Sequence, residues 1–155
     1  MKKLILTLIL PTITQAYPNT DTVNMKYGFA VIQKGEAEFI SFGVQKRIFS
    51  TLYRQTEGGF WIDRNRGNSG FGVLSLGIHV DNELFYGETM HGIGLISRKD
   101  KLLGGHFQFF HDVGTGIVSR NGSTFGIQIK HISSAGINTP NIGRNFISIK
   151  AGFTY

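Results

Sequence analysis

The sequence has no cysteine among its 155 residues and only three prolines. Without cysteine it can form no disulfide and carry no lipid on a cysteine, which excludes a small oxidised scaffold and a lipoprotein anchor. It also has few runs of Ala, Leu, Glu or Lys, the residues that favour helix, whereas glycine (21) and phenylalanine (13) are abundant. This composition disfavours helices and indicates a protein whose stability comes from a sheet.

A long hydrophobic run is absent as well. The apolar segment Leu4–Ile13 is shorter than the roughly 20 residues that a membrane-spanning helix needs. It follows Lys2 and Lys3 and precedes Thr14-Gln15-Ala16, the pattern of an export signal with a cleavage site after a small residue. We therefore expect residues 1–16 to be a signal peptide and residues 17–155 to form a single domain. An exported protein of this kind is either soluble in the periplasm or a membrane barrel.

The charge balance is basic, with 16 Lys and Arg against 10 Asp and Glu. Nucleic-acid binding would need these charges on one face, often with interleaved aromatics, and the sequence shows no such arrangement, so we expect no nucleic-acid partner. Solvated turn charges are the simplest interpretation, although basic loops would also suit a surface rich in phosphorylated lipid. Apart from the signal, the charges gather largely in predicted turns: Lys46-Arg47, Arg64–Arg66, Arg98–Lys101 and Arg144.

Alternating residues and turn signals predict eight strands and no helix. The turn signals are Lys34-Gly35, Asp81-Asn82 and Arg120–Ser123, in which Asn-Gly favours a tight primed turn. The stretch from Ile48 to Gly59 fits this pattern worst. The expected strands are Tyr27–Gln33, Glu36–Lys46, a poorly defined one ending at Asp63, Gly70–Val80, Leu84–Ile96, His106–Val118, Thr124–Ser133 and Asn145–Tyr155.

Eight strands of about ten residues predict the smallest outer-membrane barrel, all-β, antiparallel and up-and-down. The last strand alternates apolar residues, ending on Phe153 and Tyr155, with small or polar ones, and this aromatic end is similar to the terminal signal of outer-membrane proteins. Lys130 and Lys150 fall on the polar face and suit a lumen better than lipid. Alternation alone does not separate inside from outside, so a soluble sandwich or lipocalin-like barrel remains the alternative.

The outward face of Thr124–Ser133 ends in His131 and Ser133, which share a face because side chains two apart in a strand do so. Asn145 has the outward phase in the next strand and is expected beside His131. With a rise of about 3.3 Å per residue and a tilt near 40°, Asn145 lies roughly 25 Å above the end of the barrel that holds the C-terminus. If that end is periplasmic, the three residues meet the outer leaflet, where the ester bonds of lipopolysaccharide lie.

Such a cluster suits ester hydrolysis. A serine hydroxyl becomes a nucleophile when an imidazole takes its proton, and a third group orients the imidazole. A His-x-Ser pair in a strand is weak evidence by itself, but polar side chains that face lipid are costly without a purpose.

The segments His131–Ile137 and Pro140–Gly143 resemble the signature of the outer-membrane lipid A 3-O-deacylase family. The resemblance is closest over Gln128–Tyr155 and looser over the rest of the mature chain. It implies an eight-stranded barrel with a Ser-His-Glu triad on its outer wall that hydrolyses the 3-linked acyl ester of lipid A. It also implies Ser133 as the nucleophile and His131 as the general base.

The resemblance further implies that the oxyanion and the substrate are bound by Asn141, by Ser134 and by backbone N–H groups around Ala135 and Gly136. The sequence departs from the family at two positions. Ser134 stands where an Asn is usual, and Asn145 stands where the Glu is expected. An Asn can orient the imidazole but adds no charge, so we expect a slower enzyme or one that uses another carboxylate.

Glu88 is the distant candidate for such a carboxylate. The remaining histidines show no spacing typical of metal ligands, and we expect neither a metal nor a cofactor. His106 and His111, five apart in a strand, should point to opposite faces. The four are His79, His91, His106 and His111.

The preferred hypothesis is therefore a serine esterase of a Gram-negative outer membrane that removes an acyl chain from lipopolysaccharide. A catalytically silent barrel with a structural or interaction role is the alternative, favoured by Asn145. A soluble periplasmic barrel that binds lipid is the third hypothesis. The sequence leaves open a homodimer, the acyl chain preferred, and a bacterial or phage origin.

Overall fold

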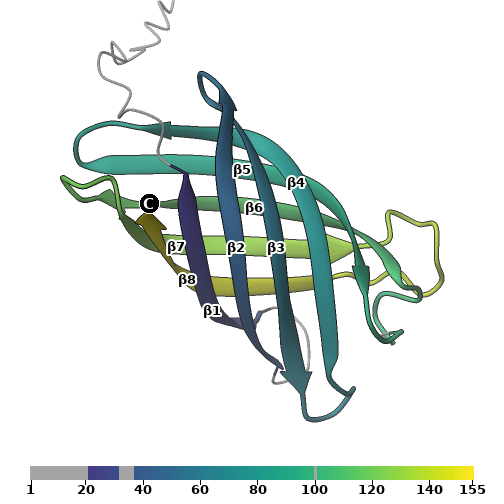
Figure 1. Cartoon of the computed structure of the whole chain (residues 1–155). Helices are drawn as coiled ribbons and strands as arrows, with labels where there is room; N and C mark the ends of the chain where they lie inside the picture. The colour runs from purple at the N-terminus through teal and green to yellow at the C-terminus, as the bar shows by residue number, and fades with distance from the viewer. Residues whose placement is uncertain (1–20, 32–36, 100) are drawn as a thin grey trace, which may run out of the picture.

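The computed structural model describes residues 21–31, 37–99 and 101–155, and it forms one closed antiparallel barrel (Figure 1). Each strand pairs with its neighbours in sequence, and β1 pairs with β8 to close the ring. Among the described residues no helix is long and apolar enough to cross a membrane. The strands are β1 Thr22–Ala30, β2 Ala37–Phe49, β3 Leu52–Asp63, β4 Ser69–Asp81, β5 Phe85–Ile96, β6 Phe107–Val118, β7 Thr124–Ser133 and β8 Arg144–Thr154.

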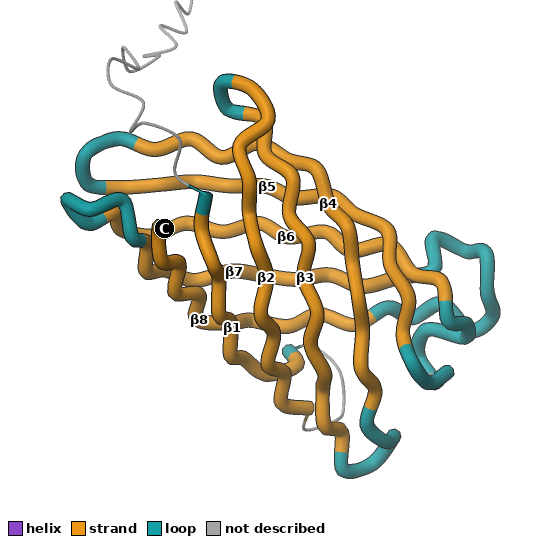
Figure 2. Tube along the Cα trace, viewed as in Figure 1, coloured by secondary structure: helices purple, strands orange, loops and turns teal. Residues whose placement is uncertain are grey.

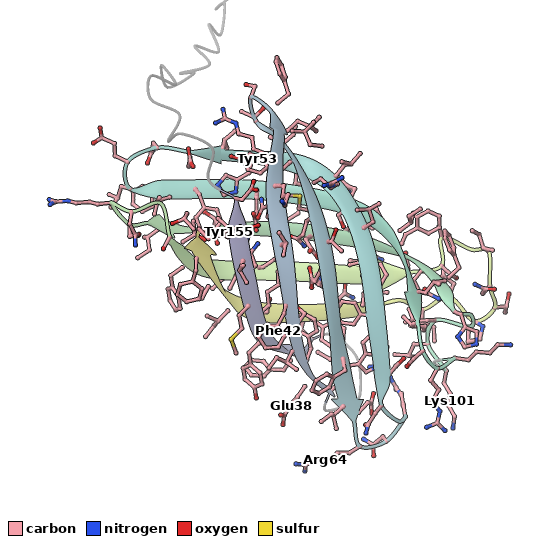
Figure 3. The ribbon with its side chains drawn as sticks, viewed as in Figure 1. Glu38, Phe42, Tyr53, Arg64, Lys101 and Tyr155 are labelled. Atoms are coloured by element: carbon pink, nitrogen blue, oxygen red, sulfur yellow. The ribbon has the colours of Figure 1, made fainter. Side chains whose placement is uncertain are left out.

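The two ends of the barrel differ in their connections (Figure 2). One end holds the start of β1 and the C-terminus, where the Tyr155 amide donates to the Asp21 carbonyl, together with the short turns after β2, β4 and β6. The opposite end holds the longer β5–β6 and β7–β8 loops, and Figure 3 shows Glu38, Arg64 and Lys101 there, away from Tyr53 and Tyr155. Short turns at one end and longer loops at the other are typical of outer-membrane barrels.

The outer wall is apolar and the lumen is polar or aromatic. On β7, Phe125, Ile127 and Ile129 are each more than half exposed, whereas Lys130 between the outward positions is fully buried. Lys150 of β8 is also buried, so both lysines lie in the lumen as predicted. An apolar face that points outward excludes the soluble barrel with an apolar interior, because lipid rather than water is the solvent that suits such a wall.

The half of the lumen nearest the long loops is filled by aromatic side chains. Trp61 and Phe146 are fully buried and their rings lie 6.1 Å apart, and Phe71 stacks on both Phe39 and Phe110. Leu102 and Leu103 of the β5–β6 loop join this cluster. The long loops are thereby anchored to the interior of the barrel at the end where the site lies.

The other half of the lumen is a buried network of charges. The Lys130 ammonium lies 3.1 Å from Glu57 and 2.9 Å from Asp112, and Lys26 lies 2.7 Å from Glu57. Lys150 lies 2.5 Å from Glu88. Buried charges are stable only when paired in this way, so the network explains why lysines recur on the inward face of the strands.

The predicted start of the first strand is wrong. β1 begins at Thr22, five residues before the predicted start at Tyr27, because its first residues pair with the last ones of β8. The strand ends at Ala30; the predicted end at Gln33 and the Lys34-Gly35 turn lie outside the described residues. The segment after Ile48 was hard to interpret because the pairing of β2 with β3 shifts between Arg47 and Phe49.

The primed turn predicted for Arg120–Ser123 is wrong. Gly122 has a φ of 82°, but Asn121 lacks the positive φ that a type I′ turn requires at both central residues. The Gly122 amide instead donates to the Ser119 carbonyl at 2.9 Å, and the Ser119 amide to the Ser123 carbonyl at 2.8 Å. The Asn121 side chain accepts from Ser119 and Ser123, which stabilises this wider turn.

Candidate active site

The outer face of β7 changes from apolar to polar at His131. Phe125, Ile127 and Ile129 face lipid, and the next two outward residues are His131 and Ser133, both partly buried. In the β7–β8 pairing His131 lies opposite Asn145, and the His131 Nδ1 atom is 2.8 Å from Asn145 Oδ1. The predicted position of Asn145 beside His131 is confirmed, and Ser133 shares the outward phase of His131.

The hydrogen bond to Asn145 determines the tautomer of the neutral imidazole. An amide oxygen only accepts, so the proton of neutral His131 sits on Nδ1, and Nε2 carries the lone pair. A lone pair on Nε2 is what a base needs to take a proton from a hydroxyl on the same face. Ser133 follows two residues later on that face, and among the described residues its hydroxyl has no hydrogen-bond partner.

Gly143 packs directly against the His131 ring. Its φ is 80°, and a Cβ at this position would lie 2.9 Å from Cε1 of the imidazole ring. Only glycine combines this left-handed backbone with such a close approach. The ring therefore rests against the backbone that leads into β8.

The β7–β8 loop, residues 134–143, is stabilised by Ser134, which is fully buried. Its amide donates to Asn141 Oδ1 at 2.8 Å, and its hydroxyl bonds with the backbone of Asn138. These contacts give Ser134 a part in shaping the loop. They also orient the Asn141 side chain, whose amide nitrogen has no partner among the described residues.

Ala135 and Gly136 form the exposed bend of this loop. Both have positive φ, 50° and 82°, and the Ile137 amide closes the bend by donating to the Ser134 carbonyl. Within the described part of the chain the amides of Ala135 and Gly136 have no acceptor. They are available N–H donors of the type that stabilises an oxyanion.

The β5–β6 loop, residues 97–106, supports the β7–β8 loop. The Ile142 amide donates to the Leu102 carbonyl at 2.9 Å, while the Leu102 side chain enters the aromatic cluster. Gly104 has a φ of 71° and approaches so closely that a Cβ there would lie 2.6 Å from the Pro140 carbonyl. The loop that carries Asn141 is thus held from the neighbouring loop and the lumen.

The sequence reasoning missed two histidines beside the site. His91 of β5 and His111 of β6 face outward and lie in register with His131. Their Nδ1 atoms are 2.8 Å apart, and the rings of His111 and His131 are 6.2 Å apart and nearly parallel. The outward phase of β5 and β6 was the available signal, because both histidines alternate with lumen-facing residues.

The expectation for Glu88 as an alternative acid is wrong. Glu88 lies in the lumen, where it bonds to Lys150, to His79 Nδ1 at 3.2 Å and to Gln128. The barrel wall separates it from the imidazole of His131, since inward and outward side chains alternate along a strand. Within the described residues no group of three or more His, Asp or Glu side chains is arranged to hold a metal ion.

His106 lies just before β6, exposed, with Nδ1 2.8 Å from the Ile96 carbonyl. Among the aromatic residues of β3 and β5, Phe60 is exposed on the outer wall, whereas Tyr53, Trp61 and Tyr86 are buried in the lumen.

Comparison with known proteins places this geometry in context. The chain resembles the crystal structure of the outer membrane enzyme PagL (21% identity, TM-score 0.64, covering 86% of this chain and 99% of that one). It also resembles neisserial surface protein A, NspA (14%, 0.60, 92% and 100%), and a de novo designed transmembrane β-barrel (12%, 0.58, 90% and 100%). These similarities show the fold, an outer-membrane β-barrel.

Comparison with curated protein sequences gave no match. The family model described as lipid A 3-O-deacylase (PagL) matches residues 36–154, which includes every residue of the candidate site. Because this match spans most of the chain, the protein belongs to the lipid A 3-O-deacylase (PagL) family.

Proposed function

We propose that this protein hydrolyses the 3-O-linked acyl ester of lipid A in the outer leaflet of the outer membrane. Ser133 is the nucleophile, His131 the general base and Asn145 the residue that orients the base. Membership of the family supports the substrate and the reaction. The observation that carries the assignment of residues is the 2.8 Å contact between His131 Nδ1 and Asn145 Oδ1, on an outward face that Ser133 shares.

In the first half-reaction, Ser133 Oγ attacks the ester carbonyl carbon and His131 Nε2 takes the hydroxyl proton. The tetrahedral oxyanion accepts hydrogen bonds from the amides of Ala135 and Gly136 and from the amide nitrogen of Asn141. The bond to the sugar oxygen then breaks, and the imidazolium returns its proton to that oxygen. The products are the deacylated sugar and an acyl-serine.

In the second half-reaction, water attacks the acyl-serine carbonyl while His131 Nε2 takes a proton from it. The intermediate collapses, Ser133 Oγ recovers the proton, and a fatty acid leaves. Asn145 keeps the imidazole in the correct tautomer throughout, but it offers no negative charge to the imidazolium. The chemistry is complete without a carboxylate, at a lower rate than a charged partner would support.

The location of the site supports lipid as the substrate. His131, Ser133 and Asn145 lie on the outer wall near the end remote from the termini, above a band of exposed Ile and Phe. With the termini in the periplasm, this height matches the outer leaflet. We further propose that residues 1–16 direct export and are removed.

The test is mass spectrometry of lipid A from a Gram-negative host that makes a fully acylated lipid A. Expression of the wild type should remove one 3-linked acyl chain, and Ser133→Ala should leave the lipid intact. Ser123→Ala, a serine in a turn at the opposite end, is the matched control and should act like the wild type. Intact lipid A with the wild type would refute the proposal.

A catalytically silent barrel is the second candidate, and Asn145 in place of the expected acid is the observation that favours it. Under that alternative the wild type is inert, and Asn145→Glu gains activity. Activity in the wild type that depends on Ser133 eliminates this alternative.

A further inference from the structure

A row of polar side chains in register with the candidate base crosses the outer wall. Strand pairing aligns His91 of β5 with His111 of β6, His111 with His131 of β7, and His131 with Asn145 of β8. All four face outward, whereas the outward positions on either side of the two additional histidines are mostly apolar, such as Ile93 and Val113. Polar groups at a lipid-facing wall are costly unless something satisfies them.

The two additional histidines form a hydrogen-bonded chain with Thr89. The Thr89 hydroxyl lies 3.1 Å from His91 Nε2, and His91 Nδ1 lies 2.8 Å from His111 Nδ1. The chain therefore uses both nitrogens of His91 but only one of His111. Among the described residues, His111 Nε2 has no hydrogen-bond partner.

We propose that His111 Nε2 binds the carbonyl oxygen of a second acyl linkage on the same lipid whose ester meets Ser133. This inference rests on the proposed function and adds to it a recognition site for a multiply acylated substrate. Acyl linkages on one lipid headgroup lie close together, and the register puts His111 on the strand beside His131, with 6.2 Å between the two rings. Adjacent strands are about 4.8 Å apart, so two neighbouring strands can contact two groups of one headgroup.

The protons of the chain fit this ligand. A carbonyl oxygen only accepts, so His111 must carry its proton on Nε2 and accept at Nδ1. His91 then donates from Nδ1 and accepts at Nε2 from the Thr89 hydroxyl, an arrangement consistent with both distances. In this arrangement every donor of the hydrogen-bonded row has an acceptor, and the Nε2–H of His111 remains as the donor for the substrate.

His111 is therefore a specificity-determining residue. Its hydrogen bond forms only when a neighbouring acyl linkage is present. The bound lipid then contacts both β6 and β7. A lipid with a single acyl ester gains nothing from it. One neutral hydrogen bond of this kind is worth about 1 kcal/mol, which corresponds to roughly a fivefold change in affinity.

The experiment measures binding of lipid A in a Ser133→Ala background, with the full barrel in detergent micelles and native mass spectrometry as the readout. His111→Phe should raise the Kd roughly fivefold. His111→Gln, which keeps a donor, should recover part of the loss. Val113→Phe places the same ring on the next outward position of β6 and should bind like the background protein. The heat-dependent shift in electrophoretic mobility verifies that each barrel is folded.

Kinetics supply the second readout: with Ser133 present, His111→Phe should raise the KM for lipid A more than it lowers kcat. Equal binding by the His111→Phe and background proteins would overturn the inference, as would an equal loss in Val113→Phe or no binding of lipid A by the background protein. If binding depends on His111 but the wild type removes no acyl chain, the proposed function fails and the binding site stands.

Discussion

Asn145 accepts a hydrogen bond from His131 across the β7–β8 hairpin, with 2.8 Å between Oδ1 and Nδ1. An uncharged amide thus takes the place where the family resemblance implies a glutamate. The amide fixes the tautomer of the imidazole, but it does not offset the positive charge that His131 gains when Ser133 is deprotonated. The pair separates two tasks, orientation and charge stabilisation, that an acid performs together.

Replacing Asn145 by an acid should accelerate the enzyme. A charge-assisted hydrogen bond is about twice as strong as a neutral one, so Asn145→Glu should raise kcat roughly tenfold. Asn145→Asp adds the charge without lengthening the side chain, so its comparison with Asn145→Glu separates the effect of charge from that of side-chain length. Asn145→Ala should lower kcat by a similar factor through loss of orientation. The release of fatty acid from lipid A gives the rates, and wild-type activity in Asn145→Ala would contradict the orienting role.

Gly143→Ala should reduce activity at least tenfold while the barrel stays folded. The new methyl group would lie 2.9 Å from His131 Cε1, so the ring must shift from the position in which its Nδ1 contacts Asn145. Gly67→Ala, in the turn between β3 and β4, is the matched control: its φ of 91° imposes a similar backbone strain, but a Cβ there meets only the flexible side chain of Arg98, at 3.3 Å. An equal loss of activity in the two variants would show that backbone strain, and not the contact with the ring, is responsible.

Lys130→Met should lower the free energy of unfolding by about 3 kcal/mol, because it leaves two buried carboxylates with too few cations. Glu57 and Asp112 lose their contacts at 3.1 and 2.9 Å, and Lys26 remains as their shared cation. Lys46→Met removes an exposed partner of Asp21 at 3.4 Å and should cost less than about 1 kcal/mol. Urea unfolding in detergent measures both. Similar losses in the two variants would contradict the structural importance of the lumenal network.

Export should remove residues 1–16, so the intact mass of the protein from outer membranes should correspond to a chain that begins at Tyr17. Replacing Ala16 by Arg should block cleavage at that bond and leave a longer chain. A mature protein that retains Leu4–Ile13 would refute the signal assignment.

The residues of one hairpin could be predicted from the sequence. His131, Ser133 and Asn145 were placed together because β7 and β8 are consecutive, their phases are clear, and the alternation of Phe125, Ile127 and Ile129 marks the outward face. The same reasoning put Lys130 and Lys150 in the lumen. The two-residue alternation of side chains and a short loop suffice for such predictions, because the pairing of two hairpin strands does not depend on the rest of the chain.

The histidine chain could not be predicted in this way. Alignment of His91 with His111 depends on the register across the long β5–β6 loop, which the sequence does not specify, and their alignment with His131 adds a second register. The role of Gly143 could not be predicted either, because its contact with the imidazole exists only once the β7–β8 loop is folded.

The sequence by itself determined that there are eight strands and which residues of the last hairpin share a face, because both follow from a period of two. The resemblance to the family added that Asn145 stands in place of an acid. Only the tertiary structure decided which polar residues lie in register on the wall, that Glu88 is enclosed in the lumen, and that Asn145 meets His131 through a hydrogen bond. Closure of the barrel fixes all registers together, and distances between strands follow from those registers.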